Sequence, residues 1–450
     1  MSEANEILRT IFDAALASAD PYYAVQKNVK LENDVLHIAA QQYDLKVFER
    51  VFVVGAGKAT ARMAQAIESI LGNRISAGLI IVKHGHSMPL NIISQMEAAH
   101  PVPDEAGVAG TKRILEMVRT ADAKSLVICL LSGGGSALLV APAKSITLKN
   151  KQETTNLLLL AGATIDEMNA VRKHLSAVKG GMLAKAAYPA QLATLLLSDV
   201  IGDRLDVIAS GPTAPDDSTF DTAQAVIAKY GLQKSIPPSV SNYFQMGLKI
   251  LIPETLKNGD RCFDGTCHVI IGSISLALKA ALKQSGALGL PAKIINTKLH
   301  GNARDAAGYL AETARKTLAK MRAGEKCCLL SGGETTVTVT GSGKGGRNQE
   351  LALAFALEIE EMDGATLLSA GTDGSDGPTD ATGAIVNGNT TPLARNLGID
   401  PHIHLTNNDS YNFFRKMDEL SGSHHQLITG PTGTNVMDIQ LLLLRKPETG

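Results

Sequence analysis

Short apolar runs alternate with longer amphipathic stretches along most of this chain. The apolar runs are rich in leucine, isoleucine and valine, and they predict buried strands at 50–54, 79–82, 125–131 and 192–197. Helical spacing of apolar residues follows the first of these runs, recurs up to about residue 119, and continues over 147–162 and 165–187. Strands that alternate with helices indicate right-handed βαβ units and a doubly wound parallel sheet.

A second series of the same kind follows a looser, proline-containing stretch at 232–265. Its predicted strands are 268–271, 293–296, 327–330, 335–340, 365–369 and 438–444, and its predicted helices are 273–285, 303–320, a helix from 347 and 409–420. We therefore expect an α/β protein with two α/β domains, residues 1–250 and 251–450, each with a largely parallel, Rossmann-like sheet. An apolar stripe over residues 7–15 predicts one further helix at the N-terminus.

Composition narrows the class of protein. The chain has 450 residues, a net charge of -1, and only 4% aromatic residues, which argues against a nucleic-acid partner and an anionic membrane surface. No apolar run approaches the ~18 residues of a membrane span, and acidic residues stand where a signal peptide carries cations. Five scattered cysteines fit a reducing compartment. We expect a cytoplasmic protein.

A glycine-rich segment lies between two elements of the second series. The sequence predicts a turn at Ser331-Gly332-Gly333 that ends in Glu334, then a loop with glycines at 341, 343, 345 and 346, and a helix that opens at Arg347. Glycines let backbone N–H groups approach an anion closely. Because a helix N-terminus disfavours a cation, Arg347 there indicates a bound anion such as phosphate. A solvated turn with unpaired cations is the alternative.

Gly55-Ala56-Gly57-Lys58 follows a predicted strand and opens a helix. A dinucleotide site of this kind needs an acid at the end of the next strand, and no Asp or Glu lies between residues 68 and 97. NAD is therefore disfavoured, whereas NADP bound through Arg74 or Lys83 remains open. The P-loop spacing is absent. Lys58, like Arg347, is a cation at a helix start, which favours contact with phosphate.

The segment Ser132-Gly133-Gly134-Gly135-Ser136 ends another predicted strand and offers bare N–H groups and two hydroxyls. An anion cradle fits this order better than a nucleophile elbow, since the G-x-S-x-G order is absent. Asp199 and Asp373 end strands too and are candidate Mg²⁺ ligands, although such acids are also ordinary turn residues. Arg172, Ser176 and Lys179 share one face of a predicted helix, which is either solvated or basic and site-lining.

Several of these motifs resemble the glycerate 2-kinase family. GAGKA at 55–59, HPVPDE at 100–105, LLSGGGSALL at 130–139, NAVRKHLSAVKGG at 169–181 and LSDVIGD at 197–203 are similar to its N-terminal domain. SGGET at 331–335, GGRNQELALA at 345–354, GTDGSDGPTDATGA at 371–384 and TGPTGTNVMDI at 429–439 are similar to its C-terminal MOFRL domain. One departure is Asn302, where relatives usually carry a glutamate.

The resemblance implies ATP- and Mg²⁺-dependent phosphorylation of D-glycerate to 2-phosphoglycerate, at a site in the cleft between two domains. It implies Lys58 and Arg347 as the catalytic pair that neutralises the transferred phosphoryl group. The candidate phosphate- and substrate-binding residues are Gly55, Gly57, Ser132, Gly133, Gly134, Gly135, Ser136, Asp199, Ser331, Gly332, Glu334, Asn348 and Asp373. An NADP-linked hydroxypyruvate reductase and a small-anion sensor are the alternatives, and the sequence predicts no oligomeric state.

Overall fold

The computed structural model describes residues 2–448, which divide into two compact units. One unit is Pro21–Ile271, and the other joins the first 20 residues to the chain from Gly272 onward. This division differs from the expected boundary after residue 250. The reason lies in two elements: the last strand of the first sheet ends only at Gly272, and the N-terminal helix packs on the second sheet.

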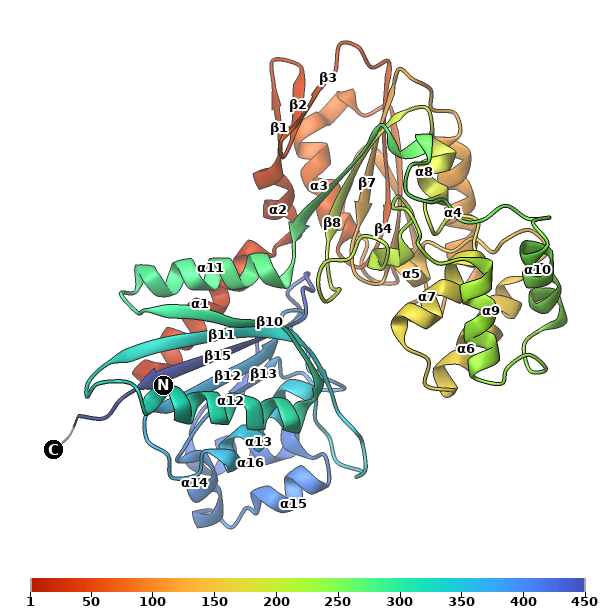
Figure 1. Ribbon diagram of the computed structural model, residues 1–450. Helices are drawn as coiled ribbons and strands as arrows, with labels where there is room; N and C mark the ends of the chain where they lie inside the picture. The colour runs from red at the N-terminus through yellow and green to blue at the C-terminus, as the bar shows by residue number, and fades with distance from the viewer. Residues whose placement is uncertain (1, 449–450) are drawn as a thin grey trace. The chain divides into compact units, whose positions relative to one another are not determined.

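The first unit is built on a six-stranded sheet (Figure 1). In spatial order its strands are β6 (Ile93–Ala98), β5 (Ala77–Lys83), β4 (Arg50–Ala56), β7 (Ser125–Leu131), β8 (Gln191–Leu197) and β9 (Thr266–Gly272). The pairs from β6 through β8 are parallel, and β7 is buried at every position. Such continuous burial explains its uninterrupted apolar sequence. The four strands predicted for this unit are confirmed.

Helices and a small antiparallel sheet complete the first unit. The helices are α2 (Pro21–Asn28), α3 (Thr60–Leu71), α4 (Glu105–Val118), α5 (Gly135–Leu138), α6 (Leu148–Leu160), α7 (Ile165–His174), α8 (Met182–Ala187), α9 (Phe220–Lys229) and α10 (Pro238–Leu248), with 3-10 turns η1 (Gly72–Arg74), η2 (Ile208–Ser210) and η3 (Arg261–Phe263). The small sheet comprises β1 (Val29–Glu32), β2 (Val35–Ile38) and β3 (Gln41–Asp44). Helices α6, α7, α9 and α10 share a separate core around Phe220 and Phe244.

The second unit has a mixed six-stranded sheet. Its order is β10 (Ala292–Asn302), β11 (Lys326–Thr336), β15 (Asp438–Arg445), β12 (Ala365–Gly371), β13 (Gly383–Asn387) and β14 (Gln426–Leu427). Only β10 and β11 pair in parallel, whereas β15 runs antiparallel to both neighbours. The α/β class is confirmed, but this sheet is not largely parallel, because β12 and β13 are joined by a short loop that permits only antiparallel pairing.

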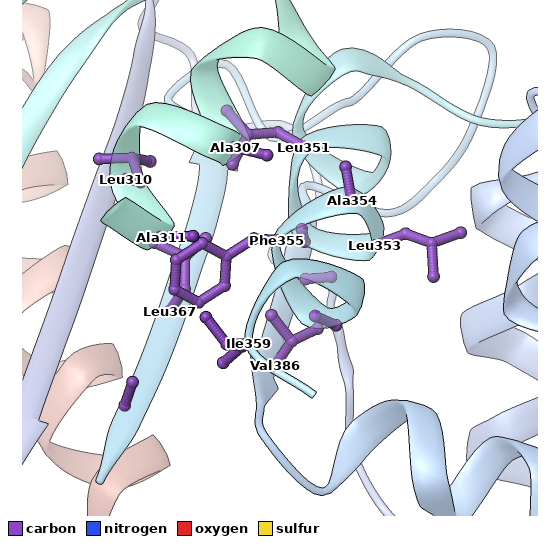
Figure 2. Packing of buried hydrophobic residues seen from close by; sticks show 14 of the residues in the cluster. Ala307, Leu310, Ala311, Leu351, Leu353, Ala354, Phe355, Ile359, Leu367 and Val386 are labelled. Atoms are coloured by element: carbon purple, nitrogen blue, oxygen red, sulfur yellow. The ribbon is translucent and has the colours of Figure 1, made fainter. Parts of the chain in front are cut away.

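Helices cover both faces of the second sheet. They are α1 (Glu3–Ser18), α11 (Ile274–Ala287), α12 (Ala303–Leu318), α13 (Arg347–Glu358), α14 (Thr390–Asn396), α15 (Pro401–Thr406) and α16 (Ser410–Ser421). α1 packs on α11, β12 and β15. On the other face, Phe355 and Leu351 of α13 pack with Ala311 of α12 and Leu367 of β12 (Figure 2). This core fixes the position of the first turn of α13, where Arg347 lies.

Three local predictions are wrong. Residues 165–187 form two helices, because the chain turns through Gly180 and Gly181, both at positive φ. The predicted turn at Ser331-Gly332-Gly333 is absent, since β11 runs through it while pairing with β10 and β15. The strand expected at 268–271 belongs to the first sheet instead of opening the second.

No helix in the described part of the chain, residues 2–448, has both the length and the apolar character needed to cross a membrane.

Candidate functional site

Two turns lie side by side at the carboxyl ends of β4 and β7 in the first unit. Lys58 follows β4, and its backbone N–H donates to the carbonyl of Gly133, which follows β7 (2.9 Å). A Cβ placed on Gly134 would lie 3.3 Å from Cγ of Lys58 and 3.0 Å from Cδ2 of His100. The structure therefore brings the lysine and the glycine turn together, as expected for neighbouring parallel strands.

The glycines and Ser132 have packing roles in this arrangement. A Cβ on Gly55 would lie 2.1 Å from the Leu130 carbonyl oxygen, and one on Gly57 would lie 2.0 Å from Oγ of Ser132. The Ser132 hydroxyl accepts from the backbone N–H of Ala59 (3.1 Å), at the start of α3. Ser132 is buried, so its side chain joins β7 to α3 and is not free to bind a ligand.

Two titratable groups border the glycine turn. Burial lowers the pKa of His100 to about 4, and the charges of Lys58, Lys83 and His86 act in the same direction, so this imidazole is neutral near pH 7. Burial raises the pKa of Asp199, an effect that Lys58 partly offsets. A Cβ on Gly133 would lie 2.4 Å from Oδ2 of Asp199. The turn therefore carries one lysine charge beside a carboxyl group with increased proton affinity.

Two of the three residues predicted to share a helix face, Arg172 and Lys179, meet instead around Ser136, whereas Ser176 donates to the Ala141 carbonyl. Helix α7 ends at His174, so Arg172 lies within the helix and Lys179 lies in the segment that follows it. Nη2 of Arg172 donates to Oγ of Ser136 (2.6 Å), and Nζ of Lys179 donates to its carbonyl oxygen (2.8 Å). Lys179 is fully buried. Of the alternatives left open by the sequence, the solvated face is therefore wrong.

In the second unit, Arg347 is held by two carboxylates. Its Nε and Nη2 donate to both oxygens of Asp438 (2.6 and 2.9 Å), and its Nη1 lies 2.7 Å from Oε1 of Glu334. Asp438 has a fully buried side chain, whereas that of Glu334 is 44% exposed. Burial lowers the pKa of Arg347, but the hydrogen bonds to Asp438 and the charges of Asp438, Glu334 and Asp376 together outweigh burial and raise it. The anion expected beside Arg347 is present, and the protein itself supplies it.

Asp376 occupies the position at the start of α13 where the sequence predicted a phosphate. Its Oδ1 accepts from the backbone N–H of Asn348 (3.0 Å) and its Oδ2 from that of Gln349 (2.9 Å). The side chain of Asn348 is buried and accepts from Ser369 (2.8 Å). Burial raises the pKa of Asp376 to about 6, against the opposing effect of the two N–H groups. Both Asp376 and Asp438 were missed as partners of this helix.

N–H groups of the glycine-rich loop before α13 also donate to acceptors within the protein. Asn408 accepts from the N–H groups of Thr340 (2.8 Å) and Gly341 (3.0 Å). The N–H groups of Ser342, Gly343 and Lys344 donate to Asn407 and Asp409. These five donors, which include the N–H groups of Gly341 and Gly343, are therefore satisfied within the protein.

Three remaining candidates take separate positions. Ser331 and Gly332 lie within β11, where Ser331 is buried and a Cβ on Gly332 would lie 2.5 Å from Ile274. Asp373 follows β12 and is half-buried, and a Cβ on Gly371 would lie 3.3 Å from its Oδ1 and 3.4 Å from Oδ1 of Asp438. Asp373 therefore lies near Asp438, the carboxylate that binds Arg347, whereas the side chain of Ser331 is buried within the sheet.

The Mg²⁺ expectation concerns two carboxylates in different units, Asp199 and Asp373. Among residues 2–448, no three His, Cys, Asp or Glu side chains gather in the manner of a complete protein metal site. Mg²⁺ commonly takes one or two carboxylates together with substrate phosphates and water, and each of the two residues can contribute one carboxylate. The donor chemistry therefore fits an ion bound together with a nucleotide.

Family models match both parts of the chain. Residues 7–245 match a domain of unknown function, DUF4147, and residues 327–438 match the MOFRL family. Together these models cover more than half of the chain.

Characterised relatives extend over nearly its whole length. The D-glycerate 2-kinase of Thermotoga maritima is 44% identical over 398 residues, 88% of this chain and 91% of that protein. A protein of Agrobacterium vitis named "Putative hydroxypyruvate reductase" is 39% identical over 98% of this chain and 94% of its own. A crystal structure of glycerate kinase from Thermotoga maritima matches with a TM-score of 0.85 and 40% identity, covering 98% of this chain and 99% of that one. The chain belongs to the glycerate 2-kinase family.

Proposed function

We propose that this protein, a kinase of the glycerate 2-kinase family, transfers the terminal phosphoryl group of ATP to the 2-hydroxyl of D-glycerate. The observation that carries the proposal is the environment of Lys58. This half-buried cation lies against the Gly134 turn, and within residues 2–448 no carboxylate forms a salt bridge with it. A lysine without such a partner, beside a glycine turn, suits a bound phosphoryl group.

The neighbours of Lys58 suit the transfer. His100 is neutral and adds no competing charge. We propose that Asp199, whose pKa burial raises, accepts the proton of the attacking hydroxyl, because a raised pKa makes a carboxylate a better base. Bound with ATP, Mg²⁺ would neutralise phosphate charge, with Asp199 or Asp373 as its carboxylate ligand.

Arg347 is proposed as the second cation. Asp438 accepts hydrogen bonds from Nε and Nη2 of Arg347. The third nitrogen, Nη1, forms an ion pair with Glu334, which is more exposed. An incoming phosphoryl oxygen can replace Glu334 at Nη1 without disturbing the buried pair. Because Lys58 and Arg347 belong to different compact units, their action on one phosphoryl group is a hypothesis that kinetics must test.

The test is an ADP-release assay with D-glycerate, ATP and Mg²⁺, followed by phosphorus NMR of the product. We expect 2-phosphoglycerate from the wild type. Lys58→Met and Arg347→Met should each lower kcat by about 10³-fold or more, whereas Lys124→Met, which removes an exposed lysine paired with Glu49, should leave turnover unchanged. If both cations stabilise one transition state, the double variant should lose far less than the product of the single losses.

The name of the Agrobacterium vitis relative makes a reductase the second candidate. A NADPH-dependent absorbance change with hydroxypyruvate, together with absence of ADP release with D-glycerate, would replace the kinase proposal. In the structure β5 ends at Lys83, which is where a dinucleotide-binding unit carries its ribose-contacting residue. Lys83→Ala should weaken NADPH binding under that alternative and leave kinase activity intact under ours.

A further inference from the structure

Arg172 has one hydrogen bond within the protein and several donors to spare. Its Nη2 donates to Oγ of Ser136 (2.6 Å). Nε and Nη1 of Arg172 have no partner among the described residues, and neither is a buried unsatisfied atom. The guanidinium is therefore anchored at one corner while its remaining N–H groups reach solvent-accessible space.

The hydroxyl of Ser136, which holds Arg172, has all its hydrogen-bonding capacity in use. Oγ of Ser136 also receives Nζ of Lys179 (3.3 Å) and lies 2.7 Å from Oγ of Ser210. With two donors already pointing at it, Ser136 must donate its own proton to Ser210, which in turn donates to Oδ1 of Asn169 (3.0 Å). This chain of hydrogen bonds fixes the orientation of every member. Ser136 and Lys179 thus position Arg172 and do not themselves offer a free donor.

The backbone that supports this anchor is strained. Ala209 and Ser210 both have positive φ, at 51° and 62°, which is unfavourable for residues other than glycine. Their conformation directs the Ala209 carbonyl to Nζ of Lys179 (3.3 Å) and the Ser210 hydroxyl to Ser136. A conformation of this kind persists where the surroundings impose it, and it is concentrated at binding and catalytic sites.

The positive charges of Arg172 and Lys179 have no carboxylate partner among the residues that the structure describes. The neighbouring Lys173 is paired with Asp206 (3.2 Å) and Asp216 (3.1 Å). Arg172 and Lys179, by contrast, form no salt bridge to a carboxylate within residues 2–448. Burial lowers the pKa of Lys179, and the nearby charge of Arg172 lowers it further. Two adjacent cations without an acid are costly in a buried setting unless an anion joins them.

We propose that Arg172 binds the carboxylate of the acceptor substrate, with Ser136 and Lys179 as its positioning residues. A guanidinium offers parallel N–H donors that match the two oxygens of a carboxylate. The inference rests on the proposed function for the identity of the acceptor, a 2-hydroxy acid. It assigns to this group of residues the recognition of the acid, a task separate from phosphoryl transfer.

The distance to Lys58 favours a small acceptor. Lys58 packs against Gly134, and Arg172 bonds to Ser136, only two residues further along the same turn. Two residues span at most about 7 Å of backbone, so the two points of the turn that Lys58 and Arg172 contact are close together. In this proposal a small 2-hydroxy acid bound at Arg172 presents its hydroxyl to the part of the turn that Lys58 contacts.

The test compares an acid with its neutral isostere. The assay measures kcat/KM with D-glycerate and with D-glyceramide, whose amide lacks the negative charge. The wild type should prefer the acid by at least about 10- to 100-fold, the range of one charge-assisted hydrogen-bonded contact. Arg172→Gln should lose most of this preference by raising KM for D-glycerate. Arg172→Lys should recover it only in part, because an ammonium cannot reproduce the bidentate geometry.

Controls separate recognition from folding. Arg119→Gln removes an exposed arginine that follows α4 and should keep the wild-type preference. Circular dichroism should be unchanged in Arg172→Gln, and its melting temperature should not fall, because the substitution removes the charge that repels Lys179. Calorimetric titration with D-glycerate in the absence of nucleotide gives a readout independent of turnover, and Arg172→Gln should weaken that binding by a similar factor.

Two outcomes overturn the proposal. An unchanged acid-to-amide preference in a folded Arg172→Gln variant shows that Arg172 does not recognise the carboxylate. A raised KM for ATP with an unchanged KM for D-glycerate assigns the site to a nucleotide phosphate instead. If D-glycerate is not phosphorylated but hydroxypyruvate binding is lost in Arg172→Gln, the carboxylate site stands and the kinase function fails, so the two failures are distinguishable.

Discussion

At the scale of single residues, Arg347 shows how a helix start can predict the need for a nearby anion without predicting which group supplies it. A cation at the first position of a helix does require an anion nearby. Asp438, Glu334 and Asp376 supply negative charge around it. Asp438 lies 91 residues further along the chain, and no local pattern connects the two. The helix start therefore predicted the need for a carboxylate or phosphate, and the fold selected the carboxylates.

Asp376 gives a prediction about pH at this scale. Its pKa is raised from 3.8 to about 6 in the folded protein. A raised folded pKa means that the protonated form is favoured in the fold. The contribution to stability is therefore full below about pH 4 and is lost as pH rises to about 6. A shift of about two units corresponds to about 3 kcal/mol.

The measurement compares melting temperatures of the wild type and Asp376→Asn between pH 4 and 7. The advantage of the wild type over the variant should shrink as pH rises to about 6 and then stay constant. Asp380→Asn is the matched control, because hydrogen bonding to Tyr411 lowers the pKa of Asp380. The contribution of Asp380 is lost only below about pH 4, so the difference between the wild type and Asp380→Asn should stay constant from pH 4 to 7. A pH dependence like that of Asp376→Asn in this control would contradict the assignment.

At the scale of elements, the glycine-rich loop before α13 is glycine-rich because it packs tightly against the protein. A Cβ on Gly341 would lie 2.3 Å from the Asn407 carbonyl oxygen, and one on Gly343 would lie 2.4 Å from Cβ of Asp409. Glycine permits close approach of backbone to any group. The sequence indicated the close approach, whereas the partner, a loop of this same chain, became evident only from the fold.

A substitution at Gly346 tests whether tight packing explains the glycines of this loop. A Cβ there would lie 2.3 Å from Cγ and 2.4 Å from the backbone carbon of Asp376. Gly346→Ala must therefore displace the carboxylate that caps α13, and we expect a loss of about 2 kcal/mol or more of stability together with reduced turnover. Chemical denaturation and the ADP-release assay measure the two effects.

A matched glycine in open space gives the opposite expectation. Gly286 and Gly308 lie within α11 and α12, at φ that is not positive, and an added Cβ meets nothing within 4 Å. Gly308→Ala should raise stability by about 0.5–1 kcal/mol, because alanine has the higher helix propensity. Equal destabilisation by Gly346→Ala and Gly308→Ala would show that contact with Asp376 is not the cause of the effect at Gly346.

At the scale of the whole molecule, the N-terminal helix belongs to the second unit, although the first unit follows it directly in the sequence. Leu8, Ile11, Phe12 and Ala15 of α1 are fully buried, and α1 packs on α11, β12 and β15. Thr434 further ties the end of this segment to the second unit through the Ala19 carbonyl (2.6 Å). The apolar stripe predicted the helix, but not the sheet that it covers.

Phe12→Ala tests this assignment. Removal of a fully buried aromatic side chain costs about 3–5 kcal/mol. Hydrogen exchange should therefore increase in α11, β12 and β15, and remain unchanged in β4 and β7 of the other unit. Thr10→Ala, an exposed position on the same helix, is the control and should alter neither. Faster exchange in β4 and β7 would place the stabilising contact of α1 elsewhere.

Local patterns in the chain were enough to predict the elements whose cause is local: the apolar runs that became β4, β5, β7 and β8, and the helices that follow them. They also predicted Lys58 beside the glycine turn after β7, because parallel strands bring their carboxyl ends together. Three features became evident from the folded chain alone. β11 passes through Ser331-Gly332-Gly333, Asp438 holds Arg347, and Arg172 contacts Ser136. Each of these depends on residues far apart in the chain, and hydrogen bonds or strand pairs between such residues leave no periodic trace in the sequence.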